Sequence, residues 1–382
     1  MSEANILAYF QSQIPGSISR LRELVEMESC STDKGAVDAI AVHLAALFEK
    51  EGCSAEILSC PSRGNALRAC WRTGGRITAR PVLLLGHLDT VWPPGTIRAR
   101  PFRVENSRAF GPGVYDMKAG ILLSLLVSRA LKEGELHPGR DVLFLFTGDE
   151  EIGTEEGLPH LEQAARDCAA VLCLEPPLAG GKVKTFRKGV GCFTIRVKGL
   201  SAHAGVEPEK GANAILEMSR QVIRLHGLND RERGTTITAG VIKGGTASNV
   251  VPAEAEAQID VRVASMEAGA AIEATIRGLQ AFDSRCTVKV EGRMNRPPLE
   301  RTPAVVGLYH KARNAALELG MDLGEGSTGG GSDGSFTAAM GIPTLDGLGV
   351  EGGGAHAPDE YIEIDDIHKR AALLCRLLET IG

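Results

Sequence analysis

Two kinds of hydrophobic pattern alternate over the first half of the chain. Segments with apolar residues three and four positions apart, typical of amphipathic helices, are followed by short runs that are apolar at nearly every position. The expected helices are residues 21–27, 36–50, 118–133 and 158–167, and the expected strands are residues 81–85, 141–147 and 170–175. Continuously apolar strands are typical of a sheet that helices cover on both faces. The pattern therefore predicts an α/β domain with a mostly parallel sheet.

The pattern changes near Gly189. Alternating segments at 191–198, 235–243, 255–263 and 286–290 are interleaved with helical segments at 211–225 and 268–281. One-sided alternation indicates an antiparallel sheet with helices on one face, that is, a smaller α+β domain. After residue 297 the earlier pattern resumes, with expected helices at 303–319 and 365–381 and a short strand near 343–345. We expect a large discontinuous domain, 1–188 and 297–382, with the smaller domain, 189–296, inserted into it.

Composition narrows the possible functions. A chain of 382 residues, 43% apolar, can bury a large core in two domains, and its net charge of −6 argues against a general nucleic-acid binder. Nine scattered cysteines without a CxxC pair suit reduced thiols, most of them in the core. We find no signal peptide and no apolar window long enough for a membrane span, and so expect a cytoplasmic protein without a membrane partner.

Acidic residues and a histidine follow three predicted buried strands. His87 and Asp89 follow the first, and an imidazole that binds a metal usually donates its other N–H to a carboxylate. The adjacent Glu150 and Glu151 follow the second strand, and Glu175 follows the third. Two neighbouring carboxylates beside a buried strand are costly unless a cation or a shared proton compensates them. Taken singly, each of these could equally be a solvated surface turn.

Two further candidates lie in glycine-rich loops. Asp116 is expected at the end of a fourth strand of the same sheet and precedes a helix, where a lone aspartate is usually an N-cap. His356 follows three glycines and an alanine near the end of the chain. The combination is improbable by chance, since it requires an acid or a histidine at four successive strand ends of one sheet and a further histidine in a flexible loop. Two imidazoles with several carboxylates are the ligand set expected for two divalent ions, most plausibly zinc.

Eight motifs together resemble the co-catalytic zinc metallopeptidases of the M20 family, most closely their glutamate carboxypeptidase branch. They are His87-Leu-Asp89-Thr-Val, Gly113-Val-Tyr-Asp116-Met-Lys-Ala-Gly, Glu150-Glu151-Ile-Gly, Leu174-Glu175-Pro, Ser201-Ala-His203-Ala-Gly, Ala247-Ser-Asn249-Val-Val-Pro, Asp260-Val-Arg262 and Gly354-Ala-His356. The resemblance implies two zinc ions per subunit, bridged by Asp116. One ion would also be held by His87 and Glu175, and the other by Glu151 and His356. It further implies a cis peptide bond between Asp116 and Met117.

The resemblance also implies a mechanism. Glu150 is expected to act as the general base on a water that the two ions acidify, while Asp89 orients His87. The inserted domain is expected to serve as a dimerisation and lid domain, from which His203 reaches the partner's site to stabilise the oxyanion. Considered without the resemblance, His203 is an ordinary turn histidine.

Several residues are expected to bind the substrate. By the resemblance, Arg262, Asn249 and backbone N–H groups near Gly331 would hold its free carboxylate, and the basic Arg296 and Lys182 would favour a glutamate side chain. Considered without the resemblance, Arg262 could instead form a salt bridge with Asp260.

These expectations describe a homodimeric two-zinc amidohydrolase that releases a C-terminal amino acid, preferably glutamate, from a small N-acyl or peptidyl substrate. An aminoacylase or dipeptidase of the same clan, with another amino-acid preference, is the alternative within enzymes. A dimeric binding protein that has lost its metals is the alternative from another class.

Overall fold

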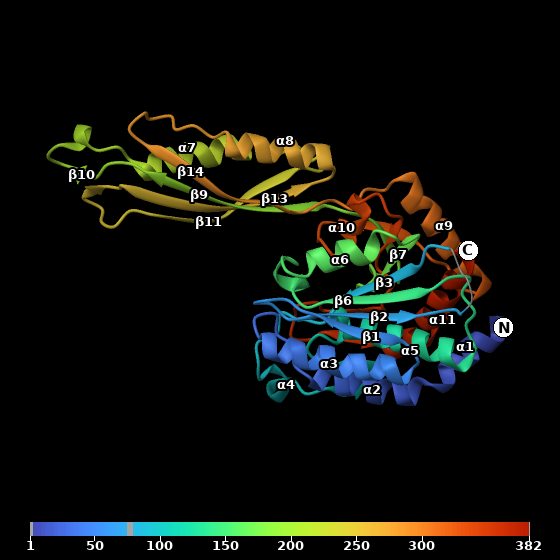
Figure 1. Ribbon diagram of the computed structural model, residues 1–382. Coiled ribbons are helices and arrows are strands. Elements are labelled where there is room, and N and C mark those ends of the chain that lie inside the picture. Colours follow the sequence, from blue (N-terminus) through green and yellow to red (C-terminus); the bar gives the residue numbers. More distant parts are fainter. Residues whose placement is uncertain (1–2, 75–78, 382) are drawn as a thin grey trace. The chain divides into compact units, whose positions relative to one another are not determined.

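The computed structural model describes residues 3–74 and 79–381, which form two compact units (Figure 1). Unit 1 comprises residues 1–186, 301–327 and 332–382, and unit 2 comprises residues 187–300 and 328–331. The outermost residues of the predicted large domain, 1–2 and 382, lie outside the described residues. Unit 1 is therefore discontinuous in sequence, and the short segment 328–331 belongs with unit 2.

A six-stranded sheet in the order β1-β2-β6-β3-β7-β16 organises unit 1. Strands β6, β3, β7 and β16 are parallel, whereas β1 and β2 form an antiparallel hairpin at one edge. The sheet is thus mixed but mostly parallel, as the continuous apolar runs predict. The strands are β1 (Ser54–Leu58), β2 (Ala66–Trp71), β3 (Val82–His87), β6 (Val142–Thr147), β7 (Ala170–Cys173) and β16 (Thr344–Leu345).

Helices cover both faces of this sheet (Figure 1). Alternate residues of β3 belong to different cores: Val82 and Leu84 pack with the helices of one face, and Leu83 and Leu85 pack with α6 and α10 on the other. This division explains why the strand is apolar at every position. The helices of unit 1 are α1 (Glu3–Ser12), α2 (Ile14–Glu26), α3 (Lys34–Lys50), α4 (Thr96–Ala99), α5 (Ala119–Glu133), α6 (Leu158–Ala165), α9 (Pro303–Glu318), α10 (Gly334–Ala339) and α11 (Ile364–Thr380), with short helical turns η1 (Val114–Lys118) and η2 (Glu150–Ile152).

Two small sheets complete unit 1. A four-stranded sheet in the order β17-β18-β5-β4 is entirely antiparallel, and β8 pairs with β15 in a second sheet. The four-stranded sheet joins two segments about 250 residues apart in sequence. Its members are β4 (Arg103–Glu105), β5 (Arg108–Phe110), β17 (Gly352–Gly353) and β18 (Tyr361–Glu363), and the second sheet contains β8 (Val183–Arg187) and β15 (Glu325–Thr328).

Unit 2 is an antiparallel sheet in the order β11-β13-β9-β14, with α7 and α8 on one face (Figure 1). Phe193, Ile195 and Val197 of β9 point into the core with the helices, whereas the residues between them face away, so the strand alternates as predicted. The elements are β9 (Gly189–Lys198), β10 (Ala202–His203), η3 (Pro208–Lys210), α7 (Ala214–His226), β11 (Thr236–Gly244), β12 (Val250–Val251), β13 (Glu254–Val263), α8 (Met266–Arg277) and β14 (Thr287–Arg296).

Some expectations differ from the structure. Asp116 does not follow a strand of the main sheet, because the strand before it, β5, belongs to the small four-stranded sheet. Only three of the expected four strand ends therefore lie on one sheet. The hairpin β1–β2 was not predicted, and β14 extends six residues beyond the predicted end at 290. Seven of the nine cysteines are buried, and no helix among the described residues is long and apolar enough to cross a membrane.

Candidate metal centre

The carboxyl ends of three parallel strands bring candidate residues to one edge of the main sheet. His87 is the last residue of β3, Glu150 and Glu151 follow β6 in a short helical turn, and Glu175 comes two residues after β7. Because these strands are parallel and adjacent, their ends meet. His87 and Glu150 are buried, and the His87 Nε2 atom lies 3.5 Å from Glu175 Oε1.

Asp89 links the first two of these strand ends. Its carboxylate oxygens accept the backbone N–H groups of Glu150 and Glu151, each at 3.1 Å. Its backbone oxygen lies 3.0 Å from His87 Nδ1, and its carboxylate lies 3.4 Å from the same nitrogen. Asp89 therefore contacts the imidazole through its backbone oxygen and its carboxylate, and it also fixes the backbone of both glutamates.

Asp116 and His356 reach this edge from two loops. Asp116 follows β5 and His356 precedes β18, and these strands are antiparallel neighbours, so the two loops emerge at the same end. Asp116 Oδ1 lies 3.2 Å from His87 Nε2, and Asp116 Oδ2 lies 3.4 Å from His356 Nε2. Glu151 lies 3.2 Å from the same His356 nitrogen. The two oxygens of one carboxylate thus face one histidine each, and the Asp116–Met117 peptide bond is cis.

The electrostatics of the cluster reflect an excess of carboxylates. Hydrogen bonds to Asp116 and Glu151 raise the pKa of His356 to about 10. Burial disfavours a charge on His87, but hydrogen bonds to Asp116 and Asp89 outweigh burial and raise its pKa well above the ordinary value. Burial acts to raise the pKa of Asp116, yet its hydrogen bonds to the two histidines lower it. The site favours positive charge, which a proton or a metal ion can supply.

The donor atoms also have the spacing of metal ligands. Zinc bonds of about 2.0–2.1 Å in tetrahedral geometry place neighbouring ligand atoms about 3.3 Å apart. Four pairs of donor atoms are 3.2–3.5 Å apart: His87–Asp116, His87–Glu175, Asp116–His356 and Glu151–His356. Two sets of three donors, His87 with Glu150 and Glu175 and His87 with Asp116 and Glu151, have atoms within 4.8 Å of one another. This nitrogen and oxygen donor set fits divalent ions such as zinc.

His203 and Asn249 lie together in unit 2. Strand β10, which ends at His203, pairs with β12, where His203 is opposite Val250, and the backbone oxygen of Asn249 accepts the N–H of Ala204 at 2.9 Å. The N–H of Gly205 donates to His203 Nδ1 at 3.1 Å. A neutral imidazole with an acceptor at Nδ1 carries its proton on Nε2. The exposed His203 side chain can therefore offer an Nε2–H donor.

Arg262, Arg296 and Gly331 lie together elsewhere in unit 2. Arg262 and Arg296 are both paired with Val190, on either side of it in the sheet. A side chain at Gly331 would collide with Arg296. Arg262 forms the salt bridge with Asp260 that its sequence position allowed, with Nε–Oδ1 and Nη2–Oδ2 distances of 3.0 and 2.8 Å. Its Nη1 atom also donates to the backbone oxygen of Gly329 at 3.2 Å, so the guanidinium is held beside the glycine-rich segment.

These two groups lie at opposite ends of the unit 2 sheet. Val190, opposite Arg262, is at one end of β9, and Lys198, opposite Glu254, is at the other. Eight residues at about 3.3 Å each separate the ends by about 26 Å. Asn249 and Arg262, thirteen residues apart in sequence, therefore lie too far apart to bind the same carboxylate within one chain.

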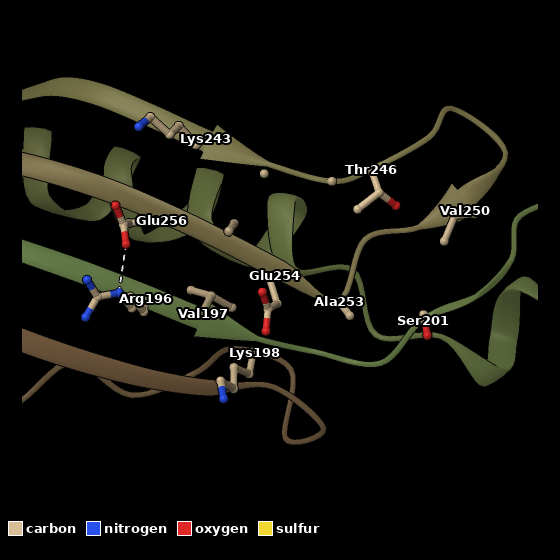
Figure 2. A pocket seen from close by; sticks show the side chains of 13 residues that line it. Arg196, Val197, Lys198, Ser201, Lys243, Thr246, Val250, Ala253, Glu254 and Glu256 are labelled. Atoms are coloured by element: carbon tan, nitrogen blue, oxygen red, sulfur yellow. Dashed lines mark hydrogen bonds and ion pairs between the residues drawn. The ribbon is translucent and has the colours of Figure 1, made fainter.

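Lys182 and a cavity in unit 2 show no contact with the other candidate site residues in the described part of the chain. Lys182 is exposed in the turn after Glu175 and forms no hydrogen bond or ion pair with the metal-centre residues in the described part of the chain. A cavity of about 590 Å³ in unit 2 is lined by Arg196, Lys198, Lys243, Glu254 and Glu256, among others (Figure 2). Arg196 is paired with Glu256 at 2.7 Å, and none of the candidate site residues lines this cavity.

Two buried carboxylates near the metal centre were not singled out from the sequence. Glu360 binds the loop that carries Asp116, and Asp333 accepts hydrogen bonds from Thr147 and Thr154, on either side of the glutamate pair. The only feature of the sequence that could have pointed to Glu360 is its position four residues after His356. Nothing in the sequence distinguished Asp333 from a loop aspartate.

Comparison with known proteins identifies the family of this chain. The profile of peptidase family M20/M25/M40 matches residues 83–380. The chain is 31% identical to carboxypeptidase G2 of Pseudomonas sp. (strain RS-16), covering 96% of this chain and 90% of that protein. It is 28% identical to succinyl-diaminopimelate desuccinylase of Methylobacterium sp. (strain 4-46), covering 96% of each. Its structure resembles aminopeptidase PepT of Bacillus cereus ATCC 10987, with a TM-score of 0.77, 23% identity, and coverage of 96% and 98%.

The match spans most of the chain, and it includes His87, Asp116, both glutamates after β6, Glu175 and His356. The relatives are hydrolases of peptide or amide bonds. The chain therefore belongs to peptidase family M20/M25/M40 and is a metal-dependent hydrolase of peptide or amide bonds.

Proposed function

We propose that this enzyme uses two zinc ions to release a C-terminal amino acid, preferably glutamate, from an N-acyl or peptidyl substrate. The observation that carries the proposal is the position of Asp116, whose two oxygens face His87 and His356 at 3.2 and 3.4 Å. A carboxylate between two imidazoles is an arrangement that can bridge a pair of metal ions. The preference for glutamate is supported by the similarity to carboxypeptidase G2 over nearly the whole chain.

The ligands divide into two sets. His87, Glu175 and Asp116 would hold one ion, and His356, Glu151 and Asp116 the other. Bound ions would polarise the scissile carbonyl and make a nearby water more acidic. The second set lies on the open side of the centre, since His356 is exposed whereas His87 and Glu175 are buried.

Glu150 is the proposed general base. It is buried, it lies beside His87 and Glu175, and its backbone is fixed by Asp89. A carboxylate held in this way can accept a proton from the attacking water and then deliver it to the leaving amine. The Nε2–H of His203 would stabilise the oxyanion of the tetrahedral intermediate.

Arg262 is the proposed anchor for the free carboxylate of the substrate. Its salt bridge with Asp260 and its bond to Gly329 fix the guanidinium plane, which limits the entropy lost when a carboxylate binds. Arg296 and the backbone near Gly331 adjoin it and would complete this subsite. Lys182 is retained as a candidate for the glutamate side chain on the basis of its charge alone.

We further propose that the enzyme is a homodimer in which His203 and Asn249 serve the partner's site. They follow the end of the sheet that lies about 26 Å from the end beside Arg262 in the same subunit, so one substrate cannot contact both groups of one chain. A second copy removes this conflict.

The surface of unit 2 supports dimer formation. Strand β11 is a nine-residue edge strand with exposed Val241 and Ile242, and such an edge normally pairs or is protected. The opposite edge, β14, carries the charged pair Lys289 and Glu291, whereas each of the two edge strands has one irregular step in its register. Helix α7 also exposes Leu216 and Ile223, at 50% and 73% of their surface.

A hydrolysis panel tests the proposed activity. N-acyl amino acids that differ only in the C-terminal residue are incubated with the zinc-loaded enzyme, the chelator-treated enzyme and the enzyme reloaded with zinc. We expect the fastest hydrolysis for glutamate, loss of activity with the chelator and recovery on reloading. A different preferred residue would favour the aminoacylase or dipeptidase alternative, full activity of the metal-free chain would contradict the two-metal assignment, and zinc binding without any hydrolysis would indicate a binding protein.

A further inference from the structure

We infer that Glu360 is a positioning residue that fixes Asp116 relative to His356 and thereby sets the geometry of the metal pair. The inference rests on the proposed function, because it assigns to Glu360 a role toward the same site. Glu360 is not itself a ligand candidate, since its carboxylate is fully engaged elsewhere.

The carboxylate of Glu360 accepts four hydrogen bonds. Oε1 accepts the backbone N–H groups of Tyr115 at 2.9 Å and Asp116 at 3.0 Å. Oε2 accepts the backbone N–H of Gly113 and the indole N–H of Trp92, both at 2.8 Å. Three of the four donors belong to the loop that carries Asp116, so this side chain defines the conformation of that loop.

The same residue is joined to His356 through the backbone. Both lie in the loop between β17 and β18, in which the N–H of Glu360 donates to Ala357 at 3.2 Å and the N–H of Ala357 donates to Gly354 at 2.8 Å. His356 has a positive φ of 60°, which a defined loop conformation must maintain. Glu360 therefore connects a rigid turn that presents one imidazole with a loop that presents the bridging carboxylate.

A carboxylate suits this position better than an amide. The side chain is only 2% exposed, and a buried charge is tolerated only when hydrogen bonds replace its hydration. Each oxygen receives two N–H donors, so a glutamine would direct its own NH₂ group at two of them. The donors that face it would lose their acceptor, and the loop of Asp116 would have to move.

The test compares three full-length variants. Glu360→Gln removes the carboxylate to which the positioning role is assigned. Glu217→Gln removes an equally buried carboxylate, which belongs to unit 2 and accepts the N–H groups of Phe282 and Asp283. Glu363→Gln changes a partly exposed glutamate of β18 that pairs with Arg108 at 2.8 Å. Zinc binding to the metal-free proteins is measured by calorimetry, together with their thermal unfolding.

We expect Glu360→Gln to weaken the binding of one of the two zinc ions about 10- to 100-fold, because loss of a residue that orients a metal ligand commonly has an effect of this size. Glu217→Gln should lower the unfolding temperature without changing zinc affinity, and Glu363→Gln should change neither. If Glu360→Gln does not fold, Trp92→Phe is measured in its place, because it removes one of the four N–H groups that donate to the Glu360 carboxylate. Weakening of the same ion by that variant supports the inference, and unchanged affinity overturns it.

The outcomes also separate this inference from the proposed function. Wild-type protein that binds two zinc ions, with Glu360→Gln binding them equally well, overturns the inference alone. An equal loss of affinity in Glu217→Gln also overturns it, because the effect would then be one of general stability. Wild-type protein that binds no divalent ion overturns the proposed function, and this inference with it.

Discussion

Replacing Glu150 with glutamine tests the proposed proton transfer most directly. The substitution keeps the size of the side chain and leaves the backbone N–H of residue 150 bonded to Asp89 at 3.1 Å. The ligands assigned to the two ions are unchanged. We therefore expect Glu150→Gln to fold, to bind two zinc ions and to lose most of its turnover.

The size of the loss follows from the role that is removed. A positioned general base contributes about 10²- to 10⁴-fold, which corresponds to about 2.7–5.4 kcal/mol in activation free energy. The substrate contacts assigned to Arg262 are untouched, so the loss should appear in kcat and leave KM nearly constant. The neighbouring Glu151 provides a matched comparison, since its oxygens lie 3.2 Å from His356 Nε2. Glu151→Gln should lose one zinc ion per subunit.

The assay combines zinc per subunit, measured by elemental analysis after dialysis, with initial rates on an N-acyl glutamate. Turnover of Glu150→Gln within a few-fold of wild type would refute the assignment of the base. Loss of zinc from Glu150→Gln would instead make Glu150 a ligand, a role that its place beside His87 and Glu175 also permits geometrically.

Three further predictions concern the dimer and the substrate. Mixing inactive His203→Ala subunits with inactive Glu150→Ala subunits should restore hydrolysis, because one site of each hybrid dimer is intact; hybrids that stay inactive would show that His203 does not serve the partner. Ile242→Lys in edge strand β11 should give monomers in sedimentation experiments, and persistent dimers would place the interface elsewhere. Arg262→Ala should lower kcat/KM for a substrate with a free α-carboxylate, by an amount that corresponds to about 1.5–3 kcal/mol of lost transition-state stabilisation, and should hardly affect the α-amidated substrate. Equal wild-type rates on both substrates would exclude a carboxylate anchor.

The sequence predicted best those elements that are buried on both sides. Val82–His87 and Val142–Thr147 are recognisable because both faces of each strand pack against helices, so no polar position interrupts them. The hairpin Ser54–Leu58 and Ala66–Trp71 escaped prediction because the first of these is an edge strand whose residues are only partly buried. Burial on one side only, without strict alternation, leaves little pattern to detect.

The candidate ligand residues could be predicted from the sequence, but the residues that hold them in position, such as Glu360, could not. Histidine and carboxylates at strand ends are visible in the sequence, since parallel strands must present their carboxyl ends together. The role of Glu360 depends on the pairing of β18 with β5, between residues about 250 positions apart, which no local pattern reveals. The separation of Asn249 from Arg262 likewise depends on the length of β13, which begins after Asn249 and contains Arg262 near its end.

The late position of His356 in the chain affects the order in which the site can form during synthesis. His87, Glu150 and Glu175 are all present once residue 175 has left the ribosome, whereas β18 and His356 follow only after the whole of unit 2 has been made. At about 5–20 residues per second, the intervening stretch takes roughly 10–40 s. During that interval the nascent chain has the proposed ligands of one ion without those of the other. The nascent chain therefore cannot complete the proposed metal pair until its last segment has paired with β5 in the four-stranded sheet.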